Sequence, residues 1–449
     1  MEFESHNSMP CRICGSKTKN PNSTSHLKTI KHQKAADERR KYIFKIAVIG
    51  GNGSGRTSFV QNVIGYSFNS ICNMPAFPID FKTFHPQVNE TKDKPFEPTI
   101  QIWDLLSMQY IRPRLLHMLF LGSRYSVLVF DTTKYESFKE ALNWLIMMMA
   151  FQRTKIPFVI VGNKIDLIPK TKGETADLAF GEYYSYAYSY LFNFYIDYLH
   201  TSSHPSETEL TQNNKELFAR IAELLAYEFE NENTVFDKTL KEYPGQNRYI
   251  LGWIVSKMED SALLRDILVN ETNDFRLRII ALKRLNEVKQ EEIQEIDKIP
   301  NKDLQSAVYL FSLDQESLYQ AALAGENIFI RTVALDLLVD QEKLLEFAVG
   351  HKDPVFRMIA LSKLHGEEYY DFVQDMYQGN DIEKQIILEH IGNDKFLFEL
   401  ISDKSTNSYQ MAKALGKIKT PKYLQILRLI GPQDLQPLIL SRLKEISHN

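Results

Sequence analysis

A glycine-rich stretch near residue 50 carries the clearest chemical signal in the sequence. It fits the phosphate-loop pattern G-x-x-x-x-G-K-[ST] at every fixed position but one, with Gly50, Gly55 and the hydroxyl of Thr57 in place. Arg56 stands where the pattern has lysine. Successive backbone N–H groups and a helix start in such a loop surround one anion. The loop therefore predicts a phosphate site; the other interpretation is a glycine-rich turn that binds nothing.

Further polar residues stand where apolar segments end. Asp104 ends one such segment and is placed to hold Mg²⁺, usually through water, beside the hydroxyl of Thr57. Asn163, Lys164 and Asp166 form an N-K-x-D sequence after another apolar segment. In that arrangement the aspartate accepts the N1 and N2 protons of guanine, the asparagine orients the site and the lysine stem covers the base.

These motifs need strands and helices to hold them. Apolar segments predict strands at residues 43–49, 79–83, 99–104, 125–131, 158–163 and 194–201, and periodic segments predict helices at 58–64, from 132 and over 212–230. Strands that alternate with helices indicate a mostly parallel sheet with helices on both faces. A tyrosine-rich run over residues 183–192 is interpreted as an amphipathic helix packed on the sheet, or as a partner surface.

Residues 43–230 resemble the Ras superfamily, and its Rab branch most closely. The similar segments are I-D-F-K-T from residue 79, I-Q-I-W-D from 100, V-F-D-T-T-K-Y-E-S-F from 129 and V-G-N-K-I-D-L from 161. The resemblance implies an α/β P-loop GTPase domain that binds GTP or GDP with Mg²⁺, rather than ATP. The S-A-K motif of the family falls at Ser202 and Ser203, whose backbone would contact guanine, but its lysine is replaced by His204. The expected nucleotide-binding residues are Gly50, Asn52, Gly53, Ser54, Gly55, Arg56, Thr57, Ser58, Asp104, Asn163, Lys164, Asp166, Ser202 and Ser203.

Departures from the family concentrate on the γ-phosphate side. Arg56 keeps the charge of the usual lysine but is larger and planar. Ser107 and Met108 replace the glycine and the water-orienting glutamine of the D-x-x-G-Q motif, and Gln109 could substitute only if the loop shifts by one residue. The threonine of the first switch aligns near Ala76, which has no hydroxyl. We therefore expect nucleotide binding with weak or absent hydrolysis, and no catalytic residue beyond the weak candidate Gln109.

The C-terminal half shows a repeat of 25 to 27 residues, with R-x-x-A-L-x-x-L in its best copies from Arg278, Arg331 and Arg357. Asparagine or aspartate recurs four residues before most copies and predicts a helix N-cap. These residues are Asn247, Asp274, Asn327, Asp353, Asn380 and Asn407. The pattern predicts an all-α solenoid of about eight HEAT-like units that binds protein partners; an irregular helical bundle is the alternative.

The N-terminal segment carries a candidate metal site. Cys11, Cys14, His26 and His32 have the spacing C-x2-C-x11-H-x5-H, close to that of a two-cysteine, two-histidine zinc finger. The middle gap is one residue short and the usual aromatic residue is missing. The alternative is a basic tail with an incidental C-x-x-C, since residues 1–42 hold nine Lys and Arg against four Asp and Glu.

Composition sets the limits of this organisation. A chain of 449 residues is too long for a single ordinary hydrophobic core, so two or three domains are expected. Its content of 44% hydrophobic and 24% charged residues is typical of globular proteins. Three cysteines argue against a disulfide framework and for a reducing, cytoplasmic location. The sequence predicts no signal peptide, membrane-spanning segment or lipidation motif. The expected boundaries are 1–41 for the tail, 42–232 for the GTPase-like domain, 233–246 for a linker and 247–449 for the solenoid.

Three functions are compatible with this organisation. The first is a GTP-binding switch or scaffold whose nucleotide state changes what the solenoid binds, under the control of a GTPase-activating or exchange factor. The second is a pseudo-GTPase that acts as an interaction protein. The third, ranked lowest, is a zinc-finger factor that contacts nucleic acid.

Overall fold

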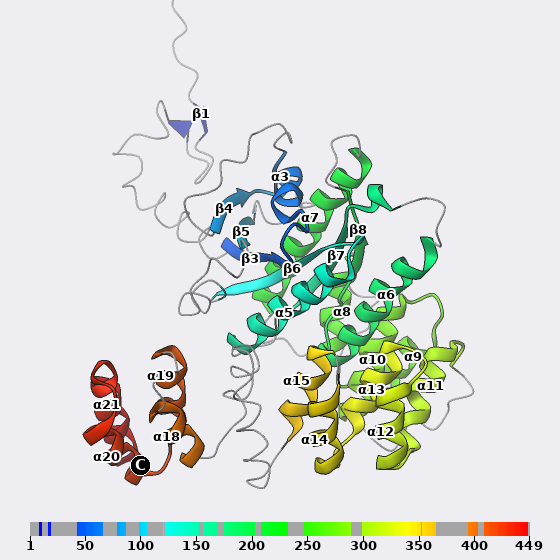
Figure 1. Ribbon diagram of the computed structural model, residues 1–449. Helices are drawn as coiled ribbons and strands as arrows, with labels where there is room; N and C mark the ends of the chain where they lie inside the picture. The colour runs from blue at the N-terminus through cyan, green and yellow to red at the C-terminus, as the bar shows by residue number, and fades with distance from the viewer. Residues whose placement is uncertain are drawn as a thin grey trace, which may run out of the picture.

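The chain folds into a sheet with flanking helices and, after it, a region built from helices (Figure 1). The computed structural model describes residues 9–10, 17–18, 43–65, 79–86, 98–105, 120, 122–151, 156–168, 174–202, 208–231, 247–288, 299–351, 353–364, 394–402 and 408–447. At the N-terminus, β1 (Met9–Pro10) pairs antiparallel with β2 (Lys17–Thr18).

Six strands form one sheet in the order β4-β5-β3-β6-β7-β8. Every neighbouring pair is parallel except β4 with β5. The central strands are nearly continuous apolar runs because both of their faces are covered. The strand bounds are β3 (Ile43–Gly50), β4 (Ile79–Phe84), β5 (Thr99–Leu105), β6 (Ser123–Asp131), β7 (Phe158–Asn163) and β8 (Tyr198–His200). This arrangement confirms the predicted α/β class, although the strand expected over 194–201 is limited to three residues.

Four helices flank the sheet. Helix α3 (Arg56–Ile64) follows the glycine-rich loop and packs against α7 (Thr208–Asn231). Helix α5 (Tyr135–Phe151) lies against β3 and β6, and α6 (Glu174–Phe192) contacts β7 and β8.

After residue 247, all regular structure in the described residues is helical. The α-helices are α8 (Arg248–Lys257), α9 (Ser261–Val269), α10 (Phe275–Val288), α11 (Lys302–Tyr309), α12 (Gln315–Ala324), α13 (Ile328–Leu337), α14 (Gln341–Gly350), α15 (Pro354–Lys363), α18 (Asp394–Ser402), α19 (Ser408–Lys417), α20 (Pro421–Ile430) and α21 (Gln436–Ser447). Asn247, Asn327 and Asp353 cap α8, α13 and α15 with their side chains, and Asp274 accepts from the backbone N of Arg276 in α10. Asn380 and Asn407 lie outside the described residues. A helical C-terminal region is thus confirmed, and its likeness to HEAT repeats stays a prediction.

Helix α6 belongs to both parts of the fold. Its Tyr188 ring lies 5.9 Å from the ring of Phe158 in β7. Two residues further on, its Tyr190 ring lies 6.2 Å from that of Phe329 in α13. The tyrosine-rich run therefore packs towards the sheet and is also a contact surface, with the C-terminal helices of the same chain as its partner.

The hydrophobic core follows the same arrangement. One cluster of buried apolar side chains extends from Phe44 in β3 to Leu361 in α15 without a break between the sheet and the helices. A second cluster, from Phe396 to Ile439, lies among α18–α21. No helix in the described part of the chain is both long and apolar enough to cross a lipid bilayer.

Candidate functional site at the glycine-rich loop

The glycine-rich loop connects the end of β3 to the start of α3, as a phosphate loop does. Gly50 ends the strand, Arg56 begins the helix, and Thr57 and Ser58 form its first turn. Gly55 has φ of 84°, and a Cβ there would lie 2.3 Å from Nδ2 of Asn163. Both the backbone conformation and the close approach therefore require glycine at this position.

The N-K-x-D segment is bonded directly to this loop. Nδ2 of Asn163 donates to the carbonyl of Ser54 at 2.9 Å. Nζ of Lys164 donates to the carbonyl of Gly53 at 2.6 Å and to Oδ2 of Asp131 at 2.7 Å. Burial alone would raise the pKa of Asp131, but hydrogen bonds from Lys164 and the neighbouring threonine lower it below its ordinary value. The fold thus joins two motifs that lie more than one hundred residues apart in the sequence.

Asp166, the last residue of the N-K-x-D segment, lies against the segment that follows β8. Its Oδ1 accepts a hydrogen bond of 2.5 Å from the hydroxyl of Ser202, which is fully buried. The preceding Thr201 accepts at its hydroxyl from Nδ2 of Asn214 in α7 and donates its backbone N to the carbonyl of Gly162. The fold thus places Ser202 beside Asp166, and Ser203 lies outside the described residues; the contact of these serines with guanine stays a prediction.

Thr57 and Asp104 meet at the other end of the loop. The hydroxyl of Thr57 donates to Oδ2 of Asp104 at 2.6 Å. Asp104 is only 1% exposed, and its Oδ1 has no hydrogen-bond partner among the described residues. Burial raises the pKa of this carboxyl, although the bond from Thr57 opposes the rise. A hydroxyl beside a carboxylate with one unpaired, buried oxygen is a donor set that suits Mg²⁺.

Arg56 does not reach into the loop as a free cation. Its side chain is 6% exposed, and its Nη1 donates to the carbonyl of Leu105 in β5. Burial lowers the pKa of Arg56, whereas the charges of Asp104 and Glu140 raise it. The guanidinium is therefore bonded to the backbone of β5, on the side of the loop where a lysine usually meets phosphate.

Glu140 lies at the glycine-rich loop, although no motif in the sequence predicts it there. It lies on α5, and its Oε2 accepts a hydrogen bond of 2.8 Å from the backbone N of Asn52 in the loop. A carboxylate thus occupies one of the N–H groups that a phosphate loop offers to anions. Glu140 lies within α5 and belongs to no recognisable motif. Asp131 differs, because a carboxylate at the end of a buried parallel strand is itself a sequence pattern that indicates a site at that edge of the sheet.

Several residues of the sequence predictions are outside the described part of the chain. They are Ala76, Ser107, Met108, Gln109, Ser203, Cys11, Cys14, His26 and His32. The residues that are described contain no group of three or more His, Cys, Asp or Glu arranged to hold a metal ion.

Known proteins are similar to the part of the chain that holds the glycine-rich loop and the N-K-x-D segment. Residues 45–166 match the model of the family described as "Roc: Ras of Complex, Roc, domain of DAPkinase". Human Ras-related protein Rab-3B is 28% identical over 149 residues, which are 31% of this chain and 63% of the relative. Ras-related protein RABG3e of Arabidopsis thaliana is 30% identical over 133 residues, which are 29% of this chain and 61% of the relative. Residues 45–166 thus form a small GTPase-like domain of the Roc and Ras type, with Rab proteins among its relatives. The chain spans about three-fifths of the length of the curated relatives it matches first.

Proposed function

We propose that the domain around the glycine-rich loop binds GTP or GDP with Mg²⁺. The main support is that Asn163 and Lys164 are hydrogen-bonded to the glycine-rich loop and that Asp166 is hydrogen-bonded to Ser202. In the proposed site, the loop binds the phosphates and the N-K-x-D segment binds the base of the same nucleotide. The residues assigned to the nucleotide are those expected from the sequence, from Gly50, Asn52, Gly53, Ser54, Gly55, Arg56, Thr57 and Ser58 to Asp104, Asn163, Lys164, Asp166, Ser202 and Ser203.

Thr57 and Asp104 would hold the magnesium ion. Bound Mg²⁺ neutralises part of the charge on the β- and γ-phosphates. The hydrogen bond between the two side chains already places both oxygens side by side, and the unpaired Oδ1 of Asp104 supports this assignment.

Hydrolysis is proposed to be weak. Arg56 is buried and donates a hydrogen bond to the carbonyl of Leu105. Met108 has no group that could orient a water molecule. Ras-type hydrolysis without an activating partner is already slow, on the order of 10⁻⁴ per second. A regulator that supplies a catalytic group, or a factor that exchanges nucleotide, is therefore the partner expected at this site.

The second candidate function is that of a pseudo-GTPase interaction protein. It is favoured by Glu140, which occupies a backbone N–H of the loop, and by the buried Arg56. In this case the domain contributes through its packing against the C-terminal helices.

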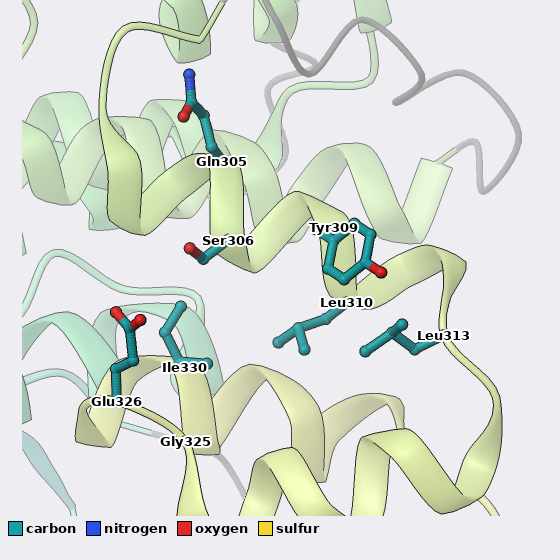
Figure 2. A pocket seen from close by; sticks show the side chains of 8 residues that line it. All are labelled: Gln305, Ser306, Tyr309, Leu310, Leu313, Gly325, Glu326 and Ile330. Atoms are coloured by element: carbon teal, nitrogen blue, oxygen red, sulfur yellow. The ribbon is translucent and has the colours of Figure 1, made fainter.

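The helical region is proposed to bind a protein partner. A cavity of about 420 Å³ lies between α11 and the start of α13. Leu310, Leu313 and Ile330 form apolar parts of its lining, and Gln305 and Glu326 are among its polar lining residues (Figure 2). An apolar wall with few polar groups is typical of sites for side chains or small ligands. A HEAT-like platform remains part of the proposal.

Zinc binding by the N-terminal segment is a separate proposal. Cys11 and Cys14 fall between β1 and β2 in the sequence, and their C-x-x-C spacing is what supports this proposal. Zinc content measured on the full chain and on a Cys11→Ser, Cys14→Ser variant tests it, and equal zinc content in both would contradict it. Nucleic-acid binding remains the lowest-ranked function.

The proposed function is tested on the purified full chain. We expect denaturation to release a guanine nucleotide, or the nucleotide-free protein to bind labelled GDP with micromolar or tighter affinity in the presence of Mg²⁺. Single-turnover experiments should then show GTP hydrolysis no faster than the slow intrinsic rates of Ras-type proteins. Absence of guanine-nucleotide binding would leave the pseudo-GTPase as the better account.

A further inference from the structure

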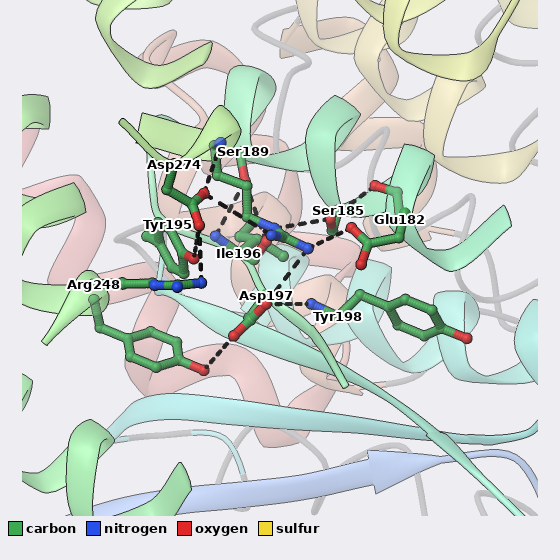
Figure 3. A network of polar contacts seen from close by, with 11 residues as sticks. Glu182, Ser185, Ser189, Tyr195, Ile196, Asp197, Tyr198, Arg248 and Asp274 are labelled. Carbon is green, nitrogen blue, oxygen red and sulfur yellow. Dashed lines mark hydrogen bonds and ion pairs between the residues drawn. The ribbon is translucent and has the colours of Figure 1, made fainter. Parts of the chain in front are cut away.

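A buried arginine of the helical region enters the GTPase-like domain. Arg276 lies on α10 and is 7% exposed. Its Nη2 lies 2.6 Å from Oε2 of Glu182 and 3.4 Å from Oδ1 of Asp197, and its Nε donates to the hydroxyl of Ser185 at 3.1 Å. Figure 3 shows this network, in which Glu182 and Ser185 belong to α6 and Asp197 precedes β8. Burial alone would lower the pKa of Arg276, but the surrounding charges, first that of Asp197, raise it above its ordinary value.

Asp197 is also bonded from a second helix of the same region. The hydroxyl of Tyr249 in α8 donates to its Oδ2 at 3.2 Å. Close by, Asp274 accepts from the hydroxyl of Tyr195 at 3.1 Å and from Nη1 of Arg248 at 3.0 Å (Figure 3). The turn between α6 and β8 is thus tied to α8 and α10 by charge-assisted hydrogen bonds, which are the stronger class.

Strand β8 leads from this turn to the base end of the proposed nucleotide site. It has three residues, and among the described strands it pairs only with β7. The residue before it, Asp197, accepts from the backbone N of Ile160, and Ser202 beyond its other end donates to Asp166. The five residue steps from Asp197 to Ser202 span at most about 17 Å when extended. A displacement of Asp197 is therefore expected to shift Ser202 as well.

We propose that Arg276 is a positioning residue for guanine recognition, acting through Asp197 and β8 on Ser202 and Asp166. This inference rests on the proposed nucleotide function. Loss of Arg276 leaves Glu182 and Asp197 without their buried cation, which strongly disfavours the present geometry of the turn. Because coupling between two sites is reciprocal, bound guanine nucleotide also strengthens the junction between α6 and α10.

The test compares Arg276→Gln with Arg278→Gln in the full chain. Arg278 lies on the same helix and is equally buried, at 5% exposed, but its Nε donates to Leu268 within the helical region. We expect Arg276→Gln to weaken GDP binding about tenfold, as for one hydrogen bond to a charged group. Arg276→Lys should restore part of the affinity, and Arg278→Gln should leave it within about twofold of the wild-type value.

Two further readouts separate positioning from loss of stability. Inosine diphosphate lacks the 2-amino group that Asp166 is proposed to recognise, so Arg276→Gln should reduce the preference for GDP over inosine diphosphate. Hydrogen exchange of residues 196–202 should also become faster in this variant and not in Arg278→Gln. Equal effects of both substitutions, or unchanged exchange at β8, would overturn the inference. Absence of GDP binding by the wild-type protein would instead overturn the proposed function, while the exchange experiment still tests the junction.

Discussion

Three charged residues interact on one side of the glycine-rich loop. Arg56 supplies one positive charge, and Asp104 and Glu140 both act on it. Because GTP carries one more negative charge than GDP, a nearby carboxylate disfavours GTP more strongly. The loop is therefore expected to prefer the diphosphate.

Glu140→Gln tests this preference. The substitution removes the carboxylate charge beside Asn52, so the affinity for a non-hydrolysable GTP analogue relative to GDP should rise by about threefold to tenfold at low salt. Titrations with fluorescent nucleotides measure the ratio. Glu136→Gln is the matched control, because Glu136 lies on the same helix but pairs with Lys139 on its exposed side. An unchanged ratio in Glu140→Gln would show that the carboxylate does not act on the nucleotide.

Asp166→Asn tests recognition of the base. An amide cannot accept both guanine protons, so GDP affinity should fall by about tenfold to a hundredfold, as for a lost hydrogen bond to a charged group. Asp260→Asn is the control, since Asp260 caps α9 and asparagine caps a helix equally well. Equal GDP affinity in wild-type protein and Asp166→Asn would remove Asp166 from the site.

At the residue scale, the sequence predicts those site residues that belong to recognisable motifs. The bonds of Asn163 and Lys164 to the loop follow the pattern expected for two nucleotide-binding motifs on one sheet edge. Glu140 and Arg276 could not be foreseen, because each lies on a helix without a distinguishing pattern and gains its role from a partner far away in the sequence.

At the scale of elements, the single helix α6 packs against both the sheet and the C-terminal helices. The ring of Tyr188 packs against β7 and that of Tyr190 against α13. Both of these side chains are fully buried. Burial raises the pKa of Tyr188 and Tyr190 well above the ordinary tyrosine value and that of Tyr186 to about 12. The sequence predicts the apolar character of this helix, but not which helices cover it.

These tyrosines predict loss of stability at alkaline pH. The native state keeps them protonated, whereas tyrosines in the unfolded state release protons above about pH 10. The unfolded state then binds fewer protons, so the free energy of unfolding should be unaffected by these groups below pH 10 and should fall as the pH rises above it. Urea unfolding between pH 8 and 11 measures this, and Tyr188→Phe with Tyr190→Phe should flatten the decline. An equally steep decline in the double variant would contradict the assignment.

At the scale of the whole molecule, the sheet and the first C-terminal helices share one core. Phe329 of α13 is fully buried and lies against Tyr190 of α6 and Phe275 of α10. Leu424 of α20 is also fully buried, but it belongs to the separate cluster of α18–α21. The repeat pattern predicts a helical region. It does not predict that this region packs against α6, because a repeat pattern indicates only the contacts between one repeat and the next.

Paired cavity variants test the shared core. Phe329→Ala should lower stability by about 3–5 kcal/mol and Leu424→Ala by about 2–5 kcal/mol. Hydrogen exchange should then accelerate in β6 and β7 for Phe329→Ala, while Leu424→Ala should affect α18–α21 alone. Unchanged exchange in β6 and β7 for Phe329→Ala would show that the two parts unfold independently.

In the function proposed for this protein, the loop and the N-K-x-D segment together form a guanine-nucleotide site. Calorimetric titration of the nucleotide-free full chain with GDP and with ADP, each with Mg²⁺, tests it most directly. We expect micromolar or tighter binding of GDP and about a hundredfold weaker binding of ADP, because a site that hydrogen-bonds guanine leaves its polar groups unpaired on adenine. Absence of GDP binding, or equal binding of GDP and ADP, would contradict it.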